Sequence, residues 1–193
     1  MRTLDTMRAL DIDGIVCSFT DEIFIPAMND ILGTEFVPYS VPVTDWDYTK
    51  VFGITKEQEQ AVWNSDVLLL FMCVAAPTVR GLELIEAYHN NNIDYCFITS
   101  RSASIDNKRS DIIKKITRLW VKIALNSKAD VYFISAQKKH ELAKTLGVTE
   151  MFEDNPDTVR LLVNEDILVF MPVYEYNKDV EVHELIYRME DWV

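Results

Sequence analysis

Short apolar runs recur along the chain without the polar alternation of a half-exposed strand. They cover residues 7–11, 94–98, 130–134, 150–153 and 167–171. Continuous apolar runs of this length are typical of strands that are buried on both faces, as in a parallel sheet. The pattern therefore predicts five buried strands.

Between these runs the apolar positions change to a helical spacing. A long helix is predicted around 112–123, where apolar residues recur three or four positions apart, and a shorter one ends near Gly147, a residue suited to a C-cap. Val79, Leu82 and Ile85 predict another helix before the second strand. Strands that alternate with helices predict an α/β fold with a doubly wound parallel sheet.

The first two predicted strands are separated by roughly 80 residues, far more than a single crossover helix needs. This stretch contains turn-forming residues such as Pro38 and Pro42, together with aromatic-rich helical segments. We therefore expect residues 17–75 to form a small, mostly helical cap, and residues 1–16 and 76–193 to form the core. The cap would lie over the carboxyl ends of the strands, where ligands bind in such sheets.

Composition narrows the class of protein. Acidic residues outnumber basic ones by 31 to 19, for a formal charge of −12, so we expect no stable nucleic-acid binding. The longest apolar run, at 67–76, is too short to span a bilayer, and the opening segment lacks the apolar run of a signal peptide. We expect a cytoplasmic protein with a small-molecule partner, and leave open whether it is a monomer or a homodimer.

Polar side chains follow four of the predicted strands. The four sets are Asp11 and Asp13, Thr99 and Ser100, Lys138 and Lys139, and Glu153 and Asp154. Two carboxylates as close as the first pair repel each other unless a cation or proton lies between them, and Mg²⁺ prefers such oxygen ligands. Hydroxyls can hold phosphate oxygens, and a lysine can neutralise phosphoryl charge. Taken singly, each set has an ordinary alternative as a turn, a helix cap or a solvated lysine.

In this order the four sets resemble the haloacid-dehalogenase-like (HAD) superfamily, and the resemblance covers nearly the whole chain. It implies that Asp11 is the nucleophile that carries the phosphoryl group. Asp13 would act as general acid and then as general base, while Thr99 and Ser100 would hold the phosphoryl oxygens. The dehalogenase branch lacks an acid at the position of Asp13, so the resemblance favours a phosphatase.

The same resemblance implies a metal ion and a catalytic lysine. The Mg²⁺ ion would be held by Asp11, Asp13 and Asp154, with Glu153 in support. The lysine would orient the nucleophile and bind phosphate oxygens. Counting back from the acid pair favours Lys139, and Lys138 stays open as the alternative.

A narrower set of residues resembles the 5′(3′)-deoxyribonucleotidase family, of the cytosolic and mitochondrial type with bacterial and phage relatives. The matching positions are 11–19, 44–47, 63, 176–177 and 188–192. The resemblance implies hydrolysis of ribo- or deoxyribonucleoside monophosphates and a nucleobase pocket that contains Phe19.

By looser alignment, Trp46 and Phe71 would join this base pocket, although Trp46, Trp63 and Phe71 could instead pack the interior of a small cap. Two other functions stay open. One is a HAD phosphatase for sugar phosphates or another small phosphomonoester, and the other is a non-catalytic binding protein with the same fold.

Overall fold

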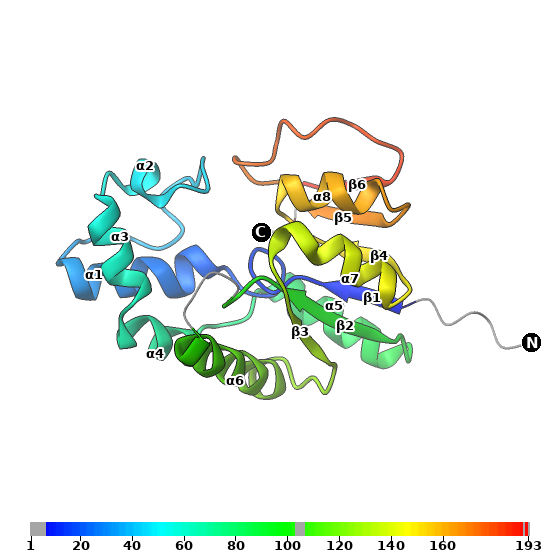
Figure 1. Cartoon of the computed structure of the whole chain (residues 1–193), viewed down its shortest axis with the longest axis horizontal. Helices are drawn as coiled ribbons and strands as arrows, with labels where there is room; N and C mark the ends of the chain where they lie inside the picture. Colours follow the sequence, from blue (N-terminus) through cyan, green and yellow to red (C-terminus); the bar gives the residue numbers. More distant parts are fainter. Residues whose placement is uncertain (1–6, 103–106, 191, 193) are drawn as a thin grey trace, which may run out of the picture.

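A parallel sheet forms the centre of the computed structural model, which describes residues 7–102, 107–190 and 192. Its six strands are β1 Met7–Leu10, β2 Tyr95–Thr99, β3 Val131–Phe133, β4 Val148–Phe152, β5 Leu168–Pro172 and β6 Ile186–Met189. They lie in the order β3-β2-β1-β4-β5-β6, and each neighbouring pair is parallel (Figure 1). The predicted α/β class is confirmed, while the expected ends of the core, residues 1 and 193, lie outside the described residues.

The strand β6 was not predicted from the sequence. It lies at the edge of the sheet beside β5, and Tyr187 on it is exposed. An edge strand that mixes Arg188 with apolar residues lacks the continuous apolar run that marks the buried strands.

Helices cover both faces of the sheet. Successive residues of a strand point to opposite faces, and accordingly Leu10 and Phe97 belong to one hydrophobic cluster while Ala9 and Ile98 belong to another. The first cluster is covered by α5 Val79–Asn90 and α6 Asn107–Ala124. The second is covered by α7 Lys139–Thr145, which follows the short 3₁₀ helix η2 Ala136–Lys138, and by α8 Pro156–Val163.

The buried face of α5 differs from the predicted one. Of the three predicted positions only Ile85 is buried, whereas Val79 and Leu82 are exposed. The helix packs instead through Gly81 and Ile85. At Gly81 it lies so close to the chain after β1 that an added Cβ would be 2.7 Å from Cα of Val16. This close approach rotates the helix away from the face that the larger apolar residues suggest.

The long helix α6 has an apolar stripe that is wider than its contact with the core. Ile113 and Trp120 are buried, whereas Ile112, Leu119 and Ile123 are exposed. Among the helices of the described residues, none is both long and apolar enough to cross a membrane.

The segment between β1 and α5 is mostly helical, as predicted. Its helices are the π-helix η1 Thr20–Phe24, α1 Ile25–Leu32, α2 Tyr48–Phe52, α3 Lys56–Trp63 and α4 Asp66–Val74. They gather to one side of the sheet (Figure 1). The start of α3 is fixed by a capping box, in which the side chains of Thr55 and Gln58 bind each other's main-chain amides. The exact limits 17–75 of a separate cap stay a prediction.

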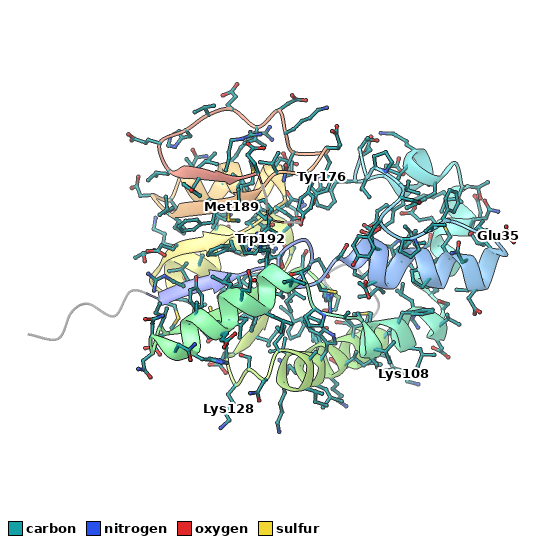
Figure 2. All side chains as sticks on the ribbon, turned by 180° about the vertical axis from the view of Figure 1, so that it is seen from behind. Glu35, Lys108, Lys128, Tyr176, Met189 and Trp192 are labelled. Carbon is teal, nitrogen blue, oxygen red and sulfur yellow. The ribbon has the colours of Figure 1, made fainter. Side chains whose placement is uncertain are left out.

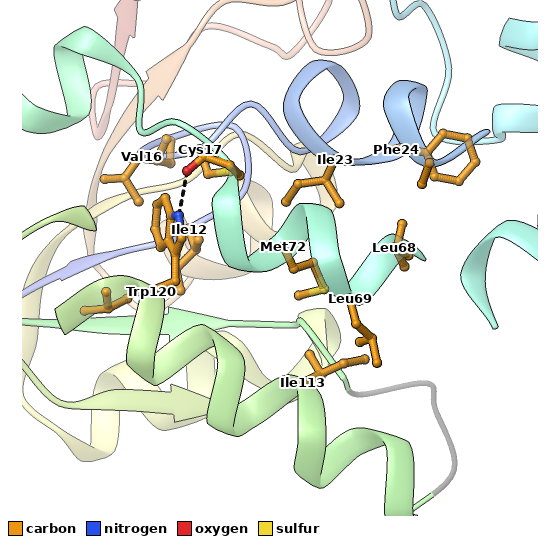
Figure 3. Close-up of a cluster of buried hydrophobic side chains, with 14 of the residues drawn as sticks. Ile12, Val16, Cys17, Ile23, Phe24, Leu68, Leu69, Met72, Ile113 and Trp120 are labelled. Atoms are coloured by element: carbon orange, nitrogen blue, oxygen red, sulfur yellow. Dashed lines mark hydrogen bonds between the residues drawn. The ribbon is translucent and has the colours of Figure 1, made fainter. Parts of the chain in front are cut away.

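The inserted helices share a hydrophobic cluster with the core. Leu69 and Met72 on α4 lie over α6 near Ile113 (Figure 3). The indole of Trp120 on α6 donates a 2.8 Å hydrogen bond to the carbonyl of Ala75, just after α4. This packing fixes the inserted helices beside the carboxyl ends of the strands.

Candidate active site

Asp11 directly follows β1 and is 5% exposed. Its Oδ1 accepts a 2.7 Å hydrogen bond from the amide of Ile12, and its Oδ2 lies 2.5 Å from Nζ of Lys139. The chain then turns at Gly14, which has a φ of +75°. A Cβ at Gly14 would lie 2.1 Å from Oδ2 of Asp154, so only glycine lets this loop approach the second carboxylate.

Lys139 is the first residue of α7 and is 1% exposed. Its Nζ lies between Oδ2 of Asp11 and Oε2 of Glu153, the latter at 2.8 Å. Burial lowers the pKa of Lys139, but the two carboxylates outweigh it and raise the pKa above its usual value. Lys138, by contrast, is exposed. Of the two candidates, Lys139 is therefore the one that reaches the carboxylates.

Three buried acids form a cluster at this edge of the sheet. Ligand atoms of Asp11, Glu153 and Asp154 all lie within 4.8 Å of one another. Burial raises the pKa of Asp11 and of Asp154 to about 7, and it raises the pKa of Glu153 against the opposing effect of Lys139. Three carboxylates this close together cannot all ionise easily unless a cation lies among them. Their oxygens are the ligands that Mg²⁺ prefers, so the cluster fits a bound Mg²⁺.

Asp13 lies beside this cluster and is paired with a residue that the sequence did not single out. Nε of Arg101 lies 2.9 Å from Oδ1 and 3.0 Å from Oδ2 of Asp13, and Nη2 lies 2.5 Å from Oδ1. Arg101 is 6% exposed. Burial lowers the pKa of Arg101, while Asp13 raises it to a net value above the usual one, so the guanidinium stays charged.

The two hydroxyl residues after β2 have different surroundings. Thr99 is fully buried, and its Oγ1 accepts a 3.2 Å hydrogen bond from the amide of Arg101. Ser100 is exposed and lines the cavity described below. Ser100 therefore borders the cavity, whereas the Thr99 hydroxyl is buried in the turn after β2.

The irregular segment after β5 also reaches the carboxylates. The hydroxyl of Tyr176 donates to Oδ2 of Asp154 at 2.5 Å, and the hydroxyl of Tyr174 donates to the carbonyl of Gly14 at 2.6 Å. The side chain of Asn177 is buried and anchors the segment by donating to two main-chain carbonyls. Tyr176 lies on the side of the sheet that faces the inserted helices (Figure 2).

A cavity of about 1650 Å³ opens between these strand ends and the inserted helices. Asp11, Asp13, Ser100, Arg101, Lys139 and Asp154 line it from the core, and Phe19, Trp46, Tyr48 and Trp63 line it from the inserted segment. The rings of Phe19 and Trp63 stack with their centroids 5.3 Å apart, and the ring centroids of Trp46 and Tyr176 are 4.4 Å apart. Phe71 packs against the large hydrophobic cluster, outside the cavity lining that the described residues form.

Comparison with known proteins gives a clear result for the fold. No family model and no curated protein matches the chain by sequence. CbbY from Rhodobacter sphaeroides, in complex with xylulose 1,5-bisphosphate, superposes with a TM-score of 0.56 over 98% of this chain and 95% of that one, at 11% identity. The chain has the fold of HAD-family hydrolases.

Two further solved structures have the same HAD-type fold. D,D-heptose 1,7-bisphosphate phosphatase from Burkholderia thailandensis gives a TM-score of 0.54 at 9% identity, over 97% of this chain and 93% of that one. A HAD family hydrolase from Deinococcus radiodurans with bound phosphate and sodium gives 0.52 at 13% identity, over 89% and 83%. At these identities the likeness concerns the fold and not the chemistry.

On this HAD-type fold the four sets named from the sequence meet at one edge of the sheet. Asp11, Lys139, Glu153 and Asp154 touch or nearly touch. The contact of Arg101 with Asp13 is not predicted by the sequence pattern. Tyr176 and Asn177 belong to the family resemblance, but their contacts with Asp154 are not predicted from the sequence.

Proposed function

We propose that the chain is a Mg²⁺-dependent phosphomonoesterase that hydrolyses ribo- or deoxyribonucleoside monophosphates through an aspartyl-phosphate intermediate. The observation that carries the proposal is Lys139, buried between Asp11 and Glu153 at the edge of a large cavity. A fixed cation beside a carboxylate nucleophile is the arrangement that stabilises a phosphoryl group in transfer. A non-catalytic binding protein would have no need to bury mutually repelling carboxylates.

The residues of the chain suit a two-step displacement. Asp11 attacks phosphorus, and its carboxylate is oriented for this by the Ile12 amide and Lys139. Asp13 gives a proton to the departing oxygen and later takes one from the water that cleaves the aspartyl phosphate. In this proposal Ser100 and Lys139 bind phosphoryl oxygens. Covalent catalysis of this kind divides one difficult step into two easier ones.

The buried acids supply the ligands for the metal. Mg²⁺ would be held by Asp11 and Asp154, with Glu153 behind them, and a ligand role for Asp13 stays a prediction. When bound, Mg²⁺ supplies positive charge that offsets the charge of the phosphoryl oxygens and carboxylates.

Aromatic side chains on the inserted segment support a nucleotide as the substrate. Phe19, Trp46, Tyr48 and Trp63 line the same cavity as the carboxylates. Stacking of a base on an aromatic ring contributes on the order of 1–3 kcal/mol. Replacing Phe19 with alanine should therefore raise KM for nucleoside monophosphates by about tenfold or more, and change KM for p-nitrophenyl phosphate little. Equal effects on the two substrates would assign Phe19 to packing of the inserted helices.

A sugar-phosphate phosphatase is the second candidate. Of the structurally similar proteins, CbbY was solved in complex with a sugar bisphosphate, and the Burkholderia thailandensis protein is a phosphatase of a sugar bisphosphate. A panel of nucleoside monophosphates, sugar phosphates and sugar bisphosphates at equal concentration with Mg²⁺ separates the two. The nucleotide proposal expects the highest kcat/KM on a nucleoside monophosphate. Asp11→Asn is the control and should lose several orders of magnitude on every substrate. Activity within tenfold of wild type in this variant would refute the mechanism.

A further inference from the structure

Arg101 is a buried cation that the four sequence motifs do not explain. Two of its nitrogens, Nε and Nη2, contact the carboxylate of Asp13 at 2.5 to 3.0 Å. The side chain of Arg101 is 3% exposed, and that of Asp13 is 32% exposed. A buried guanidinium thus holds the carboxylate from behind while the carboxylate itself borders the cavity.

The guanidinium is fixed by two aromatic rings. Its Cζ lies 5.8 Å from the ring centroid of Phe19 and 5.7 Å from that of Trp120. Aromatic faces attract cations, and the planar guanidinium offers its donors in a rigid fork. Trp120 is in turn fixed by its hydrogen bond to the carbonyl of Ala75. Arg101 therefore restricts the rotamer of Asp13 more than a flexible surface cation would.

The pairing leaves part of Asp13 free for a ligand. Oδ1 accepts two of the three contacts from Arg101, whereas Oδ2 accepts one. A carboxylate oxygen has two lone pairs, so Oδ2 can bind a proton at the one that Arg101 does not use and donate it to an oxygen of a substrate in the cavity.

We propose that Arg101 is a positioning residue that holds Asp13 at the leaving-group oxygen of the substrate. The inference rests on the proposed function. As the bond from Asp11 to phosphorus forms and the bond from phosphorus to the leaving oxygen breaks, that oxygen takes a proton from Asp13. In the second step water attacks phosphorus, the bond to Asp11 breaks, and Asp13 takes a proton from the water. In this proposal Arg101 acts on the reaction through the placement of Asp13.

The leaving group of the substrate distinguishes positioning from a general structural role. p-Nitrophenyl phosphate releases a stabilised anion that needs little protonation, phenyl phosphate has nearly the same shape but a poorer leaving group, and a nucleoside 5′-monophosphate releases an alkoxide that needs a proton. The assay compares kcat/KM of wild type and Arg101→Met on these three substrates. When the leaving group departs rapidly from the active site, kcat/KM depends only on the steps up to formation of the aspartyl phosphate, which include protonation of the leaving group.

We expect the loss in Arg101→Met to grow along this series, from a few-fold on p-nitrophenyl phosphate to about 10²-fold on the nucleotide, as for removal of a general acid. Asp13→Asn should show the same trend. The double variant should be no worse than the poorer single variant, because both changes remove one function.

A loss of equal size on all three substrates, unchanged activity, or additive losses in the double variant would overturn the inference. Circular dichroism and thermal melting check that Arg101→Met folds. If Arg101→Met does not fold, Arg101→Lys replaces it, because lysine keeps the positive charge but lacks the paired donors of the guanidinium. Arg101→Lys should show a smaller loss of kcat/KM that also grows from p-nitrophenyl phosphate to the nucleotide. Wild-type activity of Arg101→Lys on the nucleotide would overturn the inference. If wild type hydrolyses none of the three substrates, the proposed function fails and this inference fails with it. If wild type and the Asp11→Asn control behave as proposed, the outcome for Arg101 bears on positioning alone.

Discussion

The three buried acids predict an unusual dependence of stability on pH and Mg²⁺. Burial raises the pKa of Asp11 and of Asp154 from 3.8 to about 7 in the folded chain without metal. A group whose pKa is raised by folding stabilises the fold fully below its unfolded value, and this contribution is lost as the pH rises through the folded value. The metal-free protein should therefore lose stability between about pH 4 and pH 7.

The size of the effect follows from the shift. A difference of about three pKa units corresponds to about 4 kcal/mol for one group. Because Asp11 and Asp154 repel each other they titrate as a pair, so we expect a total loss on the order of 4 kcal/mol or more. For a chain of this size each kcal/mol changes Tm by about 2–4 °C, which predicts a fall of about 10 °C between pH 5 and pH 8.

Mg²⁺ should reverse this loss, because it binds the ionised carboxylates and competes with protons. A free Mg²⁺ concentration a hundred times Kd stabilises by about 2.7 kcal/mol. Thermal melts at pH 5 and pH 8, with EDTA or with Mg²⁺, should thus show a larger rise in Tm with Mg²⁺ at pH 8 than at pH 5.

Two variants separate this effect from the general repulsion in an acidic protein. Asp154→Asn should reduce both the pH-dependent loss and the response to Mg²⁺. Glu86→Gln removes the same charge from an exposed position on α5, outside the cavity lining, and should leave both unchanged. An Mg²⁺ response that is equal at the two pH values, or equal in Asp154→Asn and wild type, would refute the reasoning.

Two further predictions concern single residues of the site. Lys139→Met should lower kcat by about 10²-fold or more, as loss of one electrostatic group does, while the exposed Lys138→Met should be nearly silent; steady-state kinetics that show the reverse would assign the role to Lys138. Gly14→Ala should weaken Mg²⁺ binding by about tenfold or more, because the added Cβ would collide with Asp154, and titration calorimetry that finds wild-type affinity would contradict the close approach.

The part of the site that lies at strand ends could be predicted from the sequence. Lys139 and Asp11 are 128 positions apart, yet both follow strands of one parallel sheet, and the carboxyl ends of such strands share an edge. The position of each polar set directly after an apolar run was therefore sufficient to predict that the sets lie close together. The preference for Lys139 over Lys138 also agrees with the geometry, since consecutive residues on a helix point about 100° apart.

The contacts that join irregular segments could not be predicted in this way. Arg101 lies 88 positions from Asp13, and nothing in the Thr99-Ser100-Arg101 triplet indicates which way the guanidinium turns. Tyr176 reaches Asp154 from a segment that has neither strand nor helix periodicity. Such contacts depend on the path of the backbone between elements, which the pattern of apolar residues leaves undetermined.

The residues proposed for the phosphoryl chemistry and those proposed for binding the base lie in two different parts of the fold. The carboxylates and Lys139 are held by the ends of sheet strands, which packing on both faces makes rigid, whereas Phe19, Trp46, Tyr48 and Trp63 come from the inserted segment. Tyr176 connects the two, because its hydroxyl binds Asp154 and its ring contacts Trp46. A ligand that displaces Trp46 would therefore act on Asp154 through one side chain. For this reason we expect substitutions at Trp46 to alter the affinity for Mg²⁺ as well as for the substrate, whereas substitutions at Trp63, whose ring stacks on Phe19 and Tyr48, should alter only the affinity for the substrate.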